Sequence, residues 1–321
     1  MTKDRIRWGV LGAAKIARTD ICPAIHQTDR GEIAAIASRT PGKAEALARP
    51  YGNVSLYDDY DALLAATDID AIYIPLANHD HAPWTEKCLR AGKHVLCEKP
   101  IALKADEIDA LIAARDETGC FAAEAFMVTH HAQWRRVRDL LAEGRIGRLK
   151  QVQGAFTYFN DDLGNIRNQP DLGGGALRDI GVYPSVTTRF ATGEEPEAIE
   201  AEIEWENGVD ATARVRAAFP GFQLDFYVSM RMALRQQMVF HGTEGVITVE
   251  APFNAGKYAD AIVSIRRGDL EERERFAHVA QYQAQADAFH ATVLHGADFA
   301  CPLEFSRGNQ VMIDRIYAAA S

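Results

Sequence analysis

Residues 6–17 of this 321-residue chain read Ile-Arg-Trp-Gly-Val-Leu-Gly-Ala-Ala-Lys-Ile-Ala. The apolar run before Gly12 predicts a buried strand, and the small residues after it predict a tight turn into a helix. Such a turn lets backbone amides approach a pyrophosphate at the positive end of the helix. Ala14 and Ala17 replace the second and third glycines of the Gly-x-Gly-x-x-Gly pattern. A structural turn without a ligand therefore remains the alternative interpretation.

Short apolar runs and helix-like stretches alternate as far as Ala123. Helix start signals stand between the apolar runs, at Thr40-Pro41 and at Asp58 or Asp59. The predicted strands are Ile6 to Leu11, Glu32 to Ala37, Ala71 to Ile74, His94 to Cys97 and Phe121 to Ala123. This alternation predicts an α/β fold with a doubly wound parallel sheet of the Rossmann type.

The rhythm changes after Glu124, where one helix over residues 132–143 precedes a series of strand-like runs. These runs are residues 149–159, 199–205, 211–219, 223–230, 236–241, 245–250 and 261–266. Most are joined by turn-length gaps, which favours an α+β domain with an open, largely antiparallel sheet. Helices over residues 281–294 and 305–320 close the chain. We expect a dinucleotide-binding domain over residues 1–124 and a second domain over 125–321.

The composition is that of an ordinary globular protein, with 47% hydrophobic and 25% charged residues. The net charge of -10 disfavours binding to nucleic acid or to an acidic membrane. The chain has no signal-peptide pattern at Met1 to Arg7 and no 18-residue apolar run, so we expect a cytoplasmic protein. Its five cysteines are scattered and indicate neither a disulfide framework nor a structural zinc site.

The end of the second predicted strand bears on the choice of cofactor. An NAD-selective fold usually has an acidic residue there, but this chain has Ser38 and Arg39, with Lys43 close behind. A guanidinium can pair with a 2'-phosphate, and Ser38 and Lys43 would add a hydrogen bond and a charge. NADP is therefore favoured over NAD. The alternative for Arg39 is a solvated surface residue.

A lysine follows the fifth predicted strand, in the run His94-Val-Leu-Cys-Glu-Lys-Pro100. With this run the sequence resembles the glucose-fructose oxidoreductase, inositol 2-dehydrogenase and MocA (Gfo/Idh/MocA) family along nearly its whole length. Further matching motifs are Asn78-His-Asp-His81, Glu124-Ala-Phe-Met127 and Gly173-Gly-Gly-Ala-Leu-Arg-Asp-Ile-Gly-Val-Tyr183. The resemblance implies hydride transfer between NAD(P) and a sugar, polyol or related cyclic alcohol.

The resemblance also implies roles for single residues. Lys99 would hydrogen-bond the reacting oxygen and tune its acid/base partner, with Glu98 orienting the site and the Lys99-Pro100 bond cis. Sequence and resemblance together give the expected cofactor contacts Gly12, Ala13, Ala14, Lys15, Ile16, Ser38, Arg39, Lys43, Leu76, Asn78, His81, Glu98 and Lys99. The second domain would bind substrate, and its sheet would join copies into a homodimer or homotetramer.

The family often has histidine at its second catalytic position, where this chain has Tyr183. A phenol is a poor base at neutral pH unless a nearby ammonium stabilises it, so we expect Lys99 to assist Tyr183. Tyrosine at this position resembles the dihydrodiol dehydrogenase and NADP-dependent xylose dehydrogenase branch, which indicates an aldose oxidised at its anomeric carbon. Asp179 precedes Tyr183 by one helical turn and is expected to orient the phenol or a sugar hydroxyl. Its alternative is a cap or a solvated carboxylate.

Polar residues in the loop over residues 160–168 can replace the hydrogen bonds of a sugar with water, and we select Asn165 and Arg167 as substrate contacts. The expected substrate contacts are thus Lys99, Asn165, Arg167, Asp179 and Tyr183. The scattered histidines form no recognisable metal-ligand set, so no metal site is expected. Two other functions stay open: a catalytically silent NADP-binding regulator, and a hydrolase that uses its cofactor for transient oxidation.

Overall fold

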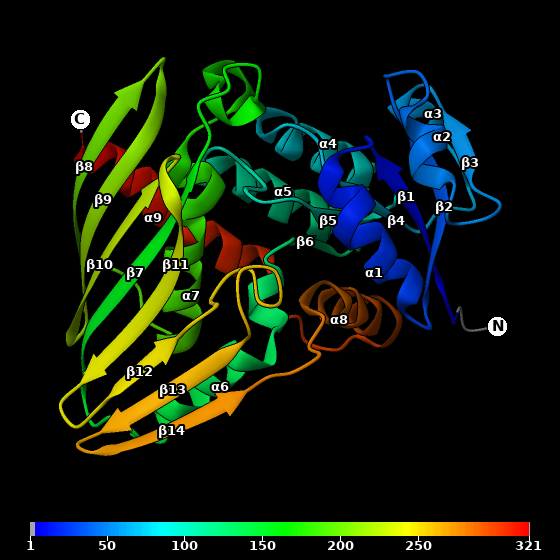
Figure 1. The fold of residues 1–321 in the computed structure, drawn as a ribbon. Coiled ribbons are helices and arrows are strands. Elements are labelled where there is room, and N and C mark those ends of the chain that lie inside the picture. Colours follow the sequence, from blue (N-terminus) through cyan, green and yellow to red (C-terminus); the bar gives the residue numbers. More distant parts are fainter. Residues whose placement is uncertain (1–3, 321) are drawn as a thin grey trace. The chain divides into compact units, whose positions relative to one another are not determined.

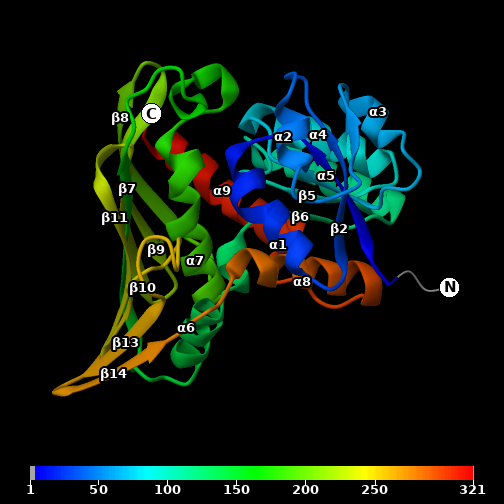
Figure 2. The same ribbon diagram turned by 45° about the vertical axis from the view of Figure 1, so that its right-hand side comes forward.

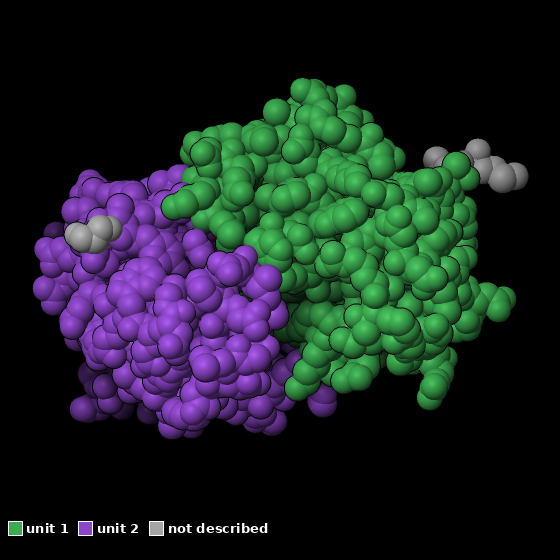
Figure 3. Space-filling model, turned by 90° about the horizontal axis from the view of Figure 1, so that it is seen from above, with its two compact units in different colours: residues 1–130, 280–307 green, residues 131–279, 308–321 purple. Residues whose placement is uncertain are grey.

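The computed structural model describes residues 4–320, which form two compact units (Figure 3). Unit 1 contains residues 4–130 and 280–307, and unit 2 contains residues 131–279 and 308–320. These units differ from the expected domains, 1–124 and 125–321, at two places. The first boundary lies six residues later, and residues 280–307 belong with the N-terminal part of the chain.

Unit 1 is built on a six-stranded parallel sheet with the order β3-β2-β1-β4-β5-β6 (Figure 1). Its strands are β1 (Ile6–Leu11), β2 (Gly31–Ala37), β3 (Ser55–Tyr57), β4 (Ala71–Ile74), β5 (His94–Cys97) and β6 (Ala122–Glu124). The strand order reverses direction between β1 and β4, so the edge where these strands end is the switch point at which open α/β sheets bind ligands. The predicted Rossmann-type sheet is confirmed.

Helices cover both faces of this sheet and bury an apolar cluster on each. The helical segments of unit 1 are η1 (Ala17–Ile21), α1 (Cys22–Gln27), α2 (Lys43–Ala48), α3 (Tyr60–Leu64), α4 (Asn78–Arg90), α5 (Ala105–Thr118), η2 (Met127–His130) and α8 (Gln281–His295). Asp59 caps α3 as expected, because its Oδ1 accepts a hydrogen bond from the amide of Asp61 at 2.9 Å. The strand β3 was not predicted, since three residues are too short to show periodicity.

Helix α8 packs on the same face of the sheet as α1, although it is distant in sequence (Figure 1). The ring of Phe289 lies 4.6 Å from that of Trp8 on β1. The indole Nε1 of Trp8 donates a hydrogen bond to Nε2 of His290 at 2.9 Å. Burial lowers the pKa of His290 to about 4, so the ring stays neutral and able to accept. These contacts explain why residues 280–307 belong to unit 1.

Unit 2 is built on an eight-stranded sheet with the order β14-β13-β12-β11-β7-β10-β9-β8. Its strands are β7 (Leu149–Phe159), β8 (Ala198–Glu206), β9 (Val209–Phe219), β10 (Phe222–Ser229), β11 (Arg231–Gly242), β12 (Val246–Val249), β13 (Ile262–Arg267) and β14 (Leu270–Arg275). Every neighbouring pair is antiparallel except β7 with β10. The expected open, largely antiparallel sheet is confirmed. The strand β14 was missed because its sequence, Leu-Glu-Glu-Arg-Glu-Arg, has no apolar alternation.

One face of this sheet is covered by helices, and Figure 2 shows the sheet nearly edge-on with α6 and α7 on that side. The helical segments are α6 (Ala132–Ala142), η3 (Ile166–Asn168), η4 (Pro170–Leu172), η5 (Leu177–Gly181), α7 (Val182–Thr192) and α9 (Leu303–Ala319), whose first residues belong to unit 1. Exposed and buried residues alternate along β10, which has one covered face. None of the helices within residues 4–320 is long and apolar enough to cross a membrane.

A substitution of His290 tests its role in holding α8. We expect His290→Gln to lower the free energy of unfolding by about 1–2 kcal/mol at pH 8, because a buried hydrogen-bonding ring is lost. Below pH 6.5 the unfolded wild-type chain takes up a proton on this histidine, whereas the folded chain does not until about pH 4. The wild-type advantage should therefore narrow between pH 6.5 and 4 in urea unfolding. His241→Gln, at an exposed strand position, is the control. A difference that stays constant with pH would contradict this role.

Candidate active site

The glycine turn lies where β1 ends. Gly12 has a φ of +95°, and its amide donates to the carbonyl of Ala37 at the end of β2, at 2.8 Å. A Cβ at Gly12 would lie 2.9 Å from Cδ2 of Leu76, just after β4, so glycine is required on two grounds. Helical structure begins at Lys15, and its first amides have no partners within a helix. Ala13, Ala14, Lys15 and Ile16 thus lie where a dinucleotide pyrophosphate would bind.

The end of β2 carries the residues expected to select NADP. Ser38 is buried, and its Oγ accepts from the amide of Thr40 at 3.2 Å. The Arg39 guanidinium is exposed and lies 5.0 Å from the centre of the Tyr60 ring. It also lies 3.6 Å from a carboxylate oxygen of Asp80, an exposed ion pair that sequence reasoning missed. Lys43 is exposed at the first residue of α2, so both cations are open to an anion.

The lysine turn follows β5 and is held from several sides. The Lys99–Pro100 peptide bond is cis, as expected. The Tyr73 hydroxyl on β4 donates to the Glu98 carboxylate at 2.7 Å. The amide of Ile101 donates to Oε1 of Glu124, at the end of β6, at 3.0 Å. The turn that carries Lys99 is therefore held by residues of β4 and β6, the two strands that flank β5.

His81, in the first turn of α4, adds a further tether. Its Nδ1 lies 2.7 Å from the carbonyl oxygen of Pro100, and its Nε2 lies 3.1 Å from that of Leu76. Burial lowers the pKa of His81 to about 4, so the ring is neutral and donates a single proton. His81 therefore lies between the segments that follow β4 and β5 and donates to one of these two carbonyls. Asn78 begins α4 beside them and is half-buried.

Two carboxyl groups around this turn have raised pKa values. Burial raises the pKa of Glu124 to about 7, although the Ile101 amide, the Ser306 hydroxyl and the Lys99 charge oppose the shift. Burial also raises the pKa of Glu98, opposed by its hydrogen bond from Tyr73 and by the Lys99 charge. The lysine therefore lies among acids that burial makes easier to protonate, an arrangement typical of functional sites.

The second set of candidate residues lies in unit 2. Asp179 is buried, and its Oδ2 accepts from the Tyr158 hydroxyl at 2.5 Å and from Nε of Arg167 at 2.9 Å. The Asp179 charge is the main cause of a raised pKa at Arg167, whereas burial is the main cause at Tyr158. Tyr158 was not selected from the sequence, because its place in an alternating strand gave no functional signal.

Tyr183 is buried in the first turn of α7, with its ring centre 5.6 Å from that of Phe156 and 5.4 Å from that of Phe253. The chain before α7 does not have regular α-helical geometry, because η5, which contains Asp179 and ends at Gly181, is a π-helical turn. The one-turn relation expected from α-helical spacing is therefore altered. Direct orientation of Tyr183 by Asp179 stays a prediction.

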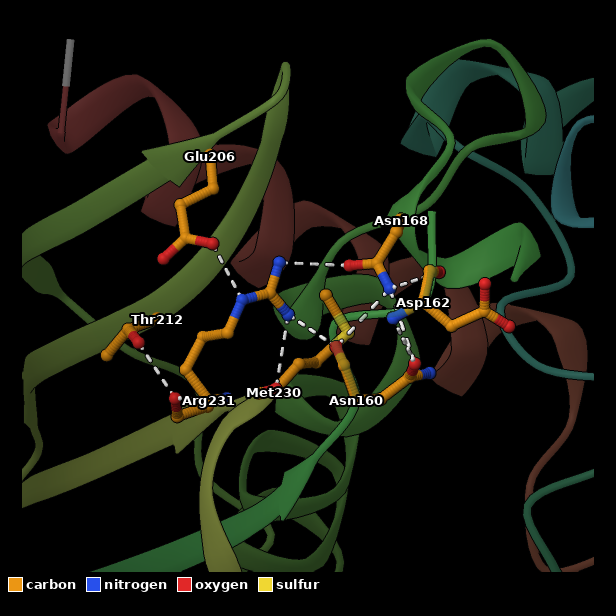
Figure 4. Close-up of polar contacts among 8 residues, drawn as sticks. Asn160, Asp162, Asn168, Glu206, Thr212, Met230 and Arg231 are labelled. Atoms are coloured by element: carbon orange, nitrogen blue, oxygen red, sulfur yellow. Dashed lines mark hydrogen bonds and ion pairs between the residues drawn. The ribbon is translucent and has the colours of Figure 1, made fainter. Parts of the chain in front are cut away.

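The loop over residues 160–168 is anchored by a polar network (Figure 4). Asn168 is buried and donates to the carbonyl of Asp162 at 2.9 Å, and its Oδ1 accepts from Arg231 at 3.1 Å. Arg231 also contacts Glu206 and the carbonyl of Asn160. The sequence did not single out Asn168 or Arg231, because Arg231 is more than 60 residues from the loop that it contacts.

The two loop residues that were selected have different surroundings. Asn165 accepts from the amide of Arg167 at 3.1 Å and caps η3, which gives it a local structural role. Arg167 extends to Asp179, and its side chain is 42% exposed, so it retains surface on which a ligand can bind. Residues 4–320 contain no cluster of three or more histidine, cysteine or acidic residues able to hold a metal ion.

The glycine run before η5 is explained by close contacts. A Cβ at Gly174 would lie 2.5 Å from the carbonyl oxygen of Arg167. Gly175 has a φ of +122°, and a Cβ there would lie 1.9 Å from Oδ1 of Asp210. The Gly175 amide donates to the Arg167 carbonyl at 3.0 Å, and the Gly175 carbonyl accepts from the Asp179 amide at 3.0 Å. The run thus connects Arg167 to Asp179 through the backbone as well as through their side chains.

Comparison with known proteins adds two family matches. Residues 6–126 match the "Oxidoreductase family, NAD-binding Rossmann fold", and residues 134–248 match the "GFO/IDH/MocA C-terminal domain". The chain is 32% identical to D-xylose 1-dehydrogenase (NADP(+)) 2 of Haloferax volcanii, over 98% of this chain and 97% of the relative. It is 35% identical to dTDP-3,4-didehydro-2,6-dideoxy-alpha-D-glucose 3-reductase of Actinomadura kijaniata, over 91% and 88% respectively.

A solved structure of a 3-ketoreductase from Actinomadura kijaniata, in complex with NADP and TDP-benzene, is similar along the whole chain. The TM-score is 0.91 at 32% identity, with 98% of each chain covered. Further solved structures of that enzyme are of variants in which one lysine is replaced by alanine or glutamate, or one tyrosine by phenylalanine. The lysine and the tyrosine replaced in those variants are 84 positions apart.

Alanine substitutions at two glycines test the packing of the glycine run. Gly175→Ala should lower the free energy of unfolding by about 3 kcal/mol or more, because overpacking against Asp210 adds to the cost of a positive φ. Gly193→Ala is the matched control, since its φ of +74° is also positive but no atom lies within 4 Å of the added Cβ. It should cost only about 1 kcal/mol. Equal losses in thermal or urea unfolding would show that the Asp210 contact is unimportant.

Proposed function

Because the chain belongs to the Gfo/Idh/MocA oxidoreductase family, we propose that it transfers a hydride between NADP and a hydroxyl-bearing carbon of a sugar, polyol or related cyclic alcohol. The observation that carries this proposal is Lys99, held in a cis-proline turn at the ligand-binding edge of the parallel sheet. The family and the oxidoreductase class expected from the sequence are confirmed.

The residues at the ends of β1 and β2 fit a bound NADP. Gly12 leaves room at the entrance of the first helix, where a pyrophosphate would meet free amides. Arg39 and Lys43 would hold the 2'-phosphate, with Arg39 leaving its exposed pairing with Asp80. A relative is an NADP-dependent dehydrogenase, and a similar enzyme has been solved with NADP. When bound, the nicotinamide supplies the site that accepts or donates the hydride.

Lys99 and Tyr183 would have different roles at the reacting hydroxyl. The Lys99 ammonium would hold the reacting oxygen and favour loss of its proton. The deprotonated Tyr183 oxygen would accept that proton in the oxidation, and the Tyr183 hydroxyl would return it in the reduction. Lys99 and Tyr183 are 84 positions apart, the same spacing as the lysine and tyrosine replaced in the similar 3-ketoreductase. This spacing supports the assignment of the pair.

Arg167 and Asp179 would hold other hydroxyls of the substrate. A guanidinium with exposed surface, paired with a buried carboxylate, offers donors and acceptors in a fixed arrangement. The named relatives act on a pentose and on a deoxy sugar. We therefore expect a sugar substrate, with an aldose oxidised at its anomeric carbon as the first candidate. Asn165 remains a candidate contact through the face that does not cap η3.

The proposal includes a cytoplasmic enzyme that associates through the sheet of unit 2. The more exposed face of β9 and β10 carries ion-paired side chains such as Arg216 and Asp225, 3.0 Å apart. A hollow of about 620 Å³ lies over this face, lined by residues of β7 to β11. A second copy of the sheet would cover it, giving a homodimer or homotetramer. The five cysteines are all free thiols, which fits a reducing compartment.

A substrate panel tests the activity. The protein is mixed with NADP and a set of aldoses, polyols and dihydrodiols. We expect at least one of these compounds to reduce the cofactor, measured as an increase in the absorbance of NADPH. Lys99→Met should then lower kcat by about 10²- to 10⁴-fold, the usual contribution of acid-base assistance, and leave the Kd of NADP within a few-fold. Lys150→Met, at an exposed lysine, is the control.

The outcomes of that panel separate the alternatives. Tight NADP binding without turnover of any substrate would favour a silent regulator. Product release without net reduced cofactor would favour a hydrolase that oxidises transiently. Full activity of Lys99→Met would contradict the proposed mechanism.

Cofactor selection is tested separately at Arg39. Arg39→Asp should raise the KM for NADP by about 10- to 100-fold, because one charge-assisted pairing is lost, and change the KM for NAD far less. Arg49→Asp, an exposed arginine at the other end of α2, is the matched control. An equal rise for both cofactors would mean that Arg39 does not bind the 2'-phosphate.

A further inference from the structure

Asp210, the second residue of strand β9, is a buried acid that sequence reasoning did not select. Its side chain and backbone are only 1% exposed. Oδ2 accepts from the amide of Leu177 at 2.6 Å, and Oδ1 accepts from the Tyr317 hydroxyl on α9 at 2.7 Å. A buried carboxylate is costly unless hydrogen bonds satisfy it, so both donors are needed to keep it charged.

The amide that Asp210 holds lies at the start of the segment with the candidate catalytic residues. Leu177 is the first residue of η5, Asp179 follows two residues later, and Tyr183 follows in α7. The Asp210 carboxylate also packs closely against Gly175 in the preceding turn, where an added Cβ would overlap it. Asp210 therefore holds the backbone through the Leu177 amide and packs closely against Gly175.

Tyr317 and Arg178 complete the surroundings of this carboxylate. The Arg178 guanidinium lies 5.3 Å from the centre of the Tyr317 ring, and its charge opposes the effect of burial on Asp210. Trp205, paired with Asp210 in the sheet, has its ring 6.1 Å from that of Tyr317. Burial raises the pKa of Asp210 to about 6, and Asp314 is the other acid that acts on Tyr317.

We propose that Asp210 is a positioning residue for the oxidoreductase reaction, fixing the segment of residues 175–183 through the Leu177 amide and the Tyr317 hydroxyl. It does not touch the reacting atoms; it acts through Asp179 and Tyr183. Since these two residues are assigned by the proposed function, the inference rests on that function. Asp210 belongs to a strand and Tyr317 to the last helix, so together they connect the segment to two elements of unit 2.

The anchoring is tested without any substrate, by hydrogen exchange of the backbone amides. In Asp210→Asn and in Tyr317→Phe, amides of residues 177–183 should exchange at least about tenfold faster, because each variant loses one charge-assisted hydrogen bond. Amides of β10 should be unchanged. Asp260→Asn, at an exposed position, and Tyr258→Phe, at a half-buried position, are the controls. Unchanged exchange over 177–183 in both test variants would overturn the proposal.

The effect on the reaction is measured with the best substrate of the panel. Both variants should lower kcat by about tenfold at pH 8, with the Kd of NADP unchanged. The ratio of the wild-type kcat to the kcat of Asp210→Asn should also shrink as pH drops through about 6, because protonation removes an acceptor from Asp210 in the wild type alone.

The outcomes distinguish the two claims. If the wild-type protein turns over no substrate, the proposed function fails, and the exchange measurement alone decides whether Asp210 anchors the segment. Faster exchange with kcat within twofold of wild type would show that Asp210 is structural and would overturn the positioning role. A ratio of wild-type to Asp210→Asn kcat that stays constant from pH 8 to pH 5 would also contradict it.

Discussion

The hydrogen bond from the amide of Ile101 to the buried carboxylate of Glu124 is the interaction on which the lysine turn depends. This bond fixes the amide of the Pro100–Ile101 peptide group, and His81 contacts the carbonyl of the same peptide group. Glu124 ends β6, and His81 lies in the first turn of α4, which follows β4. Backbone pairing within the parallel sheet sets the register of both strands. Contacts to the neighbouring backbone thus position Lys99, so its position does not depend on contacts of its ammonium group.

Unit 2 uses the same device at a different place. Asp210 accepts the amide of Leu177, two residues before Asp179, just as Glu124 accepts the amide two residues after Lys99. Each carboxylate also accepts from a hydroxyl, Ser306 for Glu124 and Tyr317 for Asp210. Both hydroxyls belong to α9, and burial raises the pKa of both acids. In both units, a buried acid holds the backbone beside a candidate site residue.

Much of the fold was predictable because its signals are local. Apolar runs gave five strands of unit 1, and the motif around Lys99 indicated both the family and the cis bond. The assignment of residues 280–307 was not predictable, because the pattern of α8 shows an apolar face without showing that Trp8 covers it. Periodicity predicts that one face of a helix is buried, but the tertiary structure is needed to show which element covers that face.

The candidate site was predictable to the extent that its residues stand in contiguous motifs. Arg167 and Asp179 were each selected from their own segments, and the structure pairs them. Tyr158 and Arg231 were missed because a single polar residue in a strand has no signal until its partners are known. The contact between Arg39 and Asp80 was missed for the same reason, since it joins two segments of unit 1.

The central claim is direct hydride transfer between a carbon of the substrate and the nicotinamide. The most direct measurement uses an accepted aldose that carries deuterium on its anomeric carbon, followed by mass spectrometry of the reduced cofactor. The account predicts one deuterium per reduced nicotinamide, and a slower rate than with the unlabelled sugar if bond cleavage limits turnover. Recovery of the deuterium in water, with an unlabelled cofactor, would contradict it.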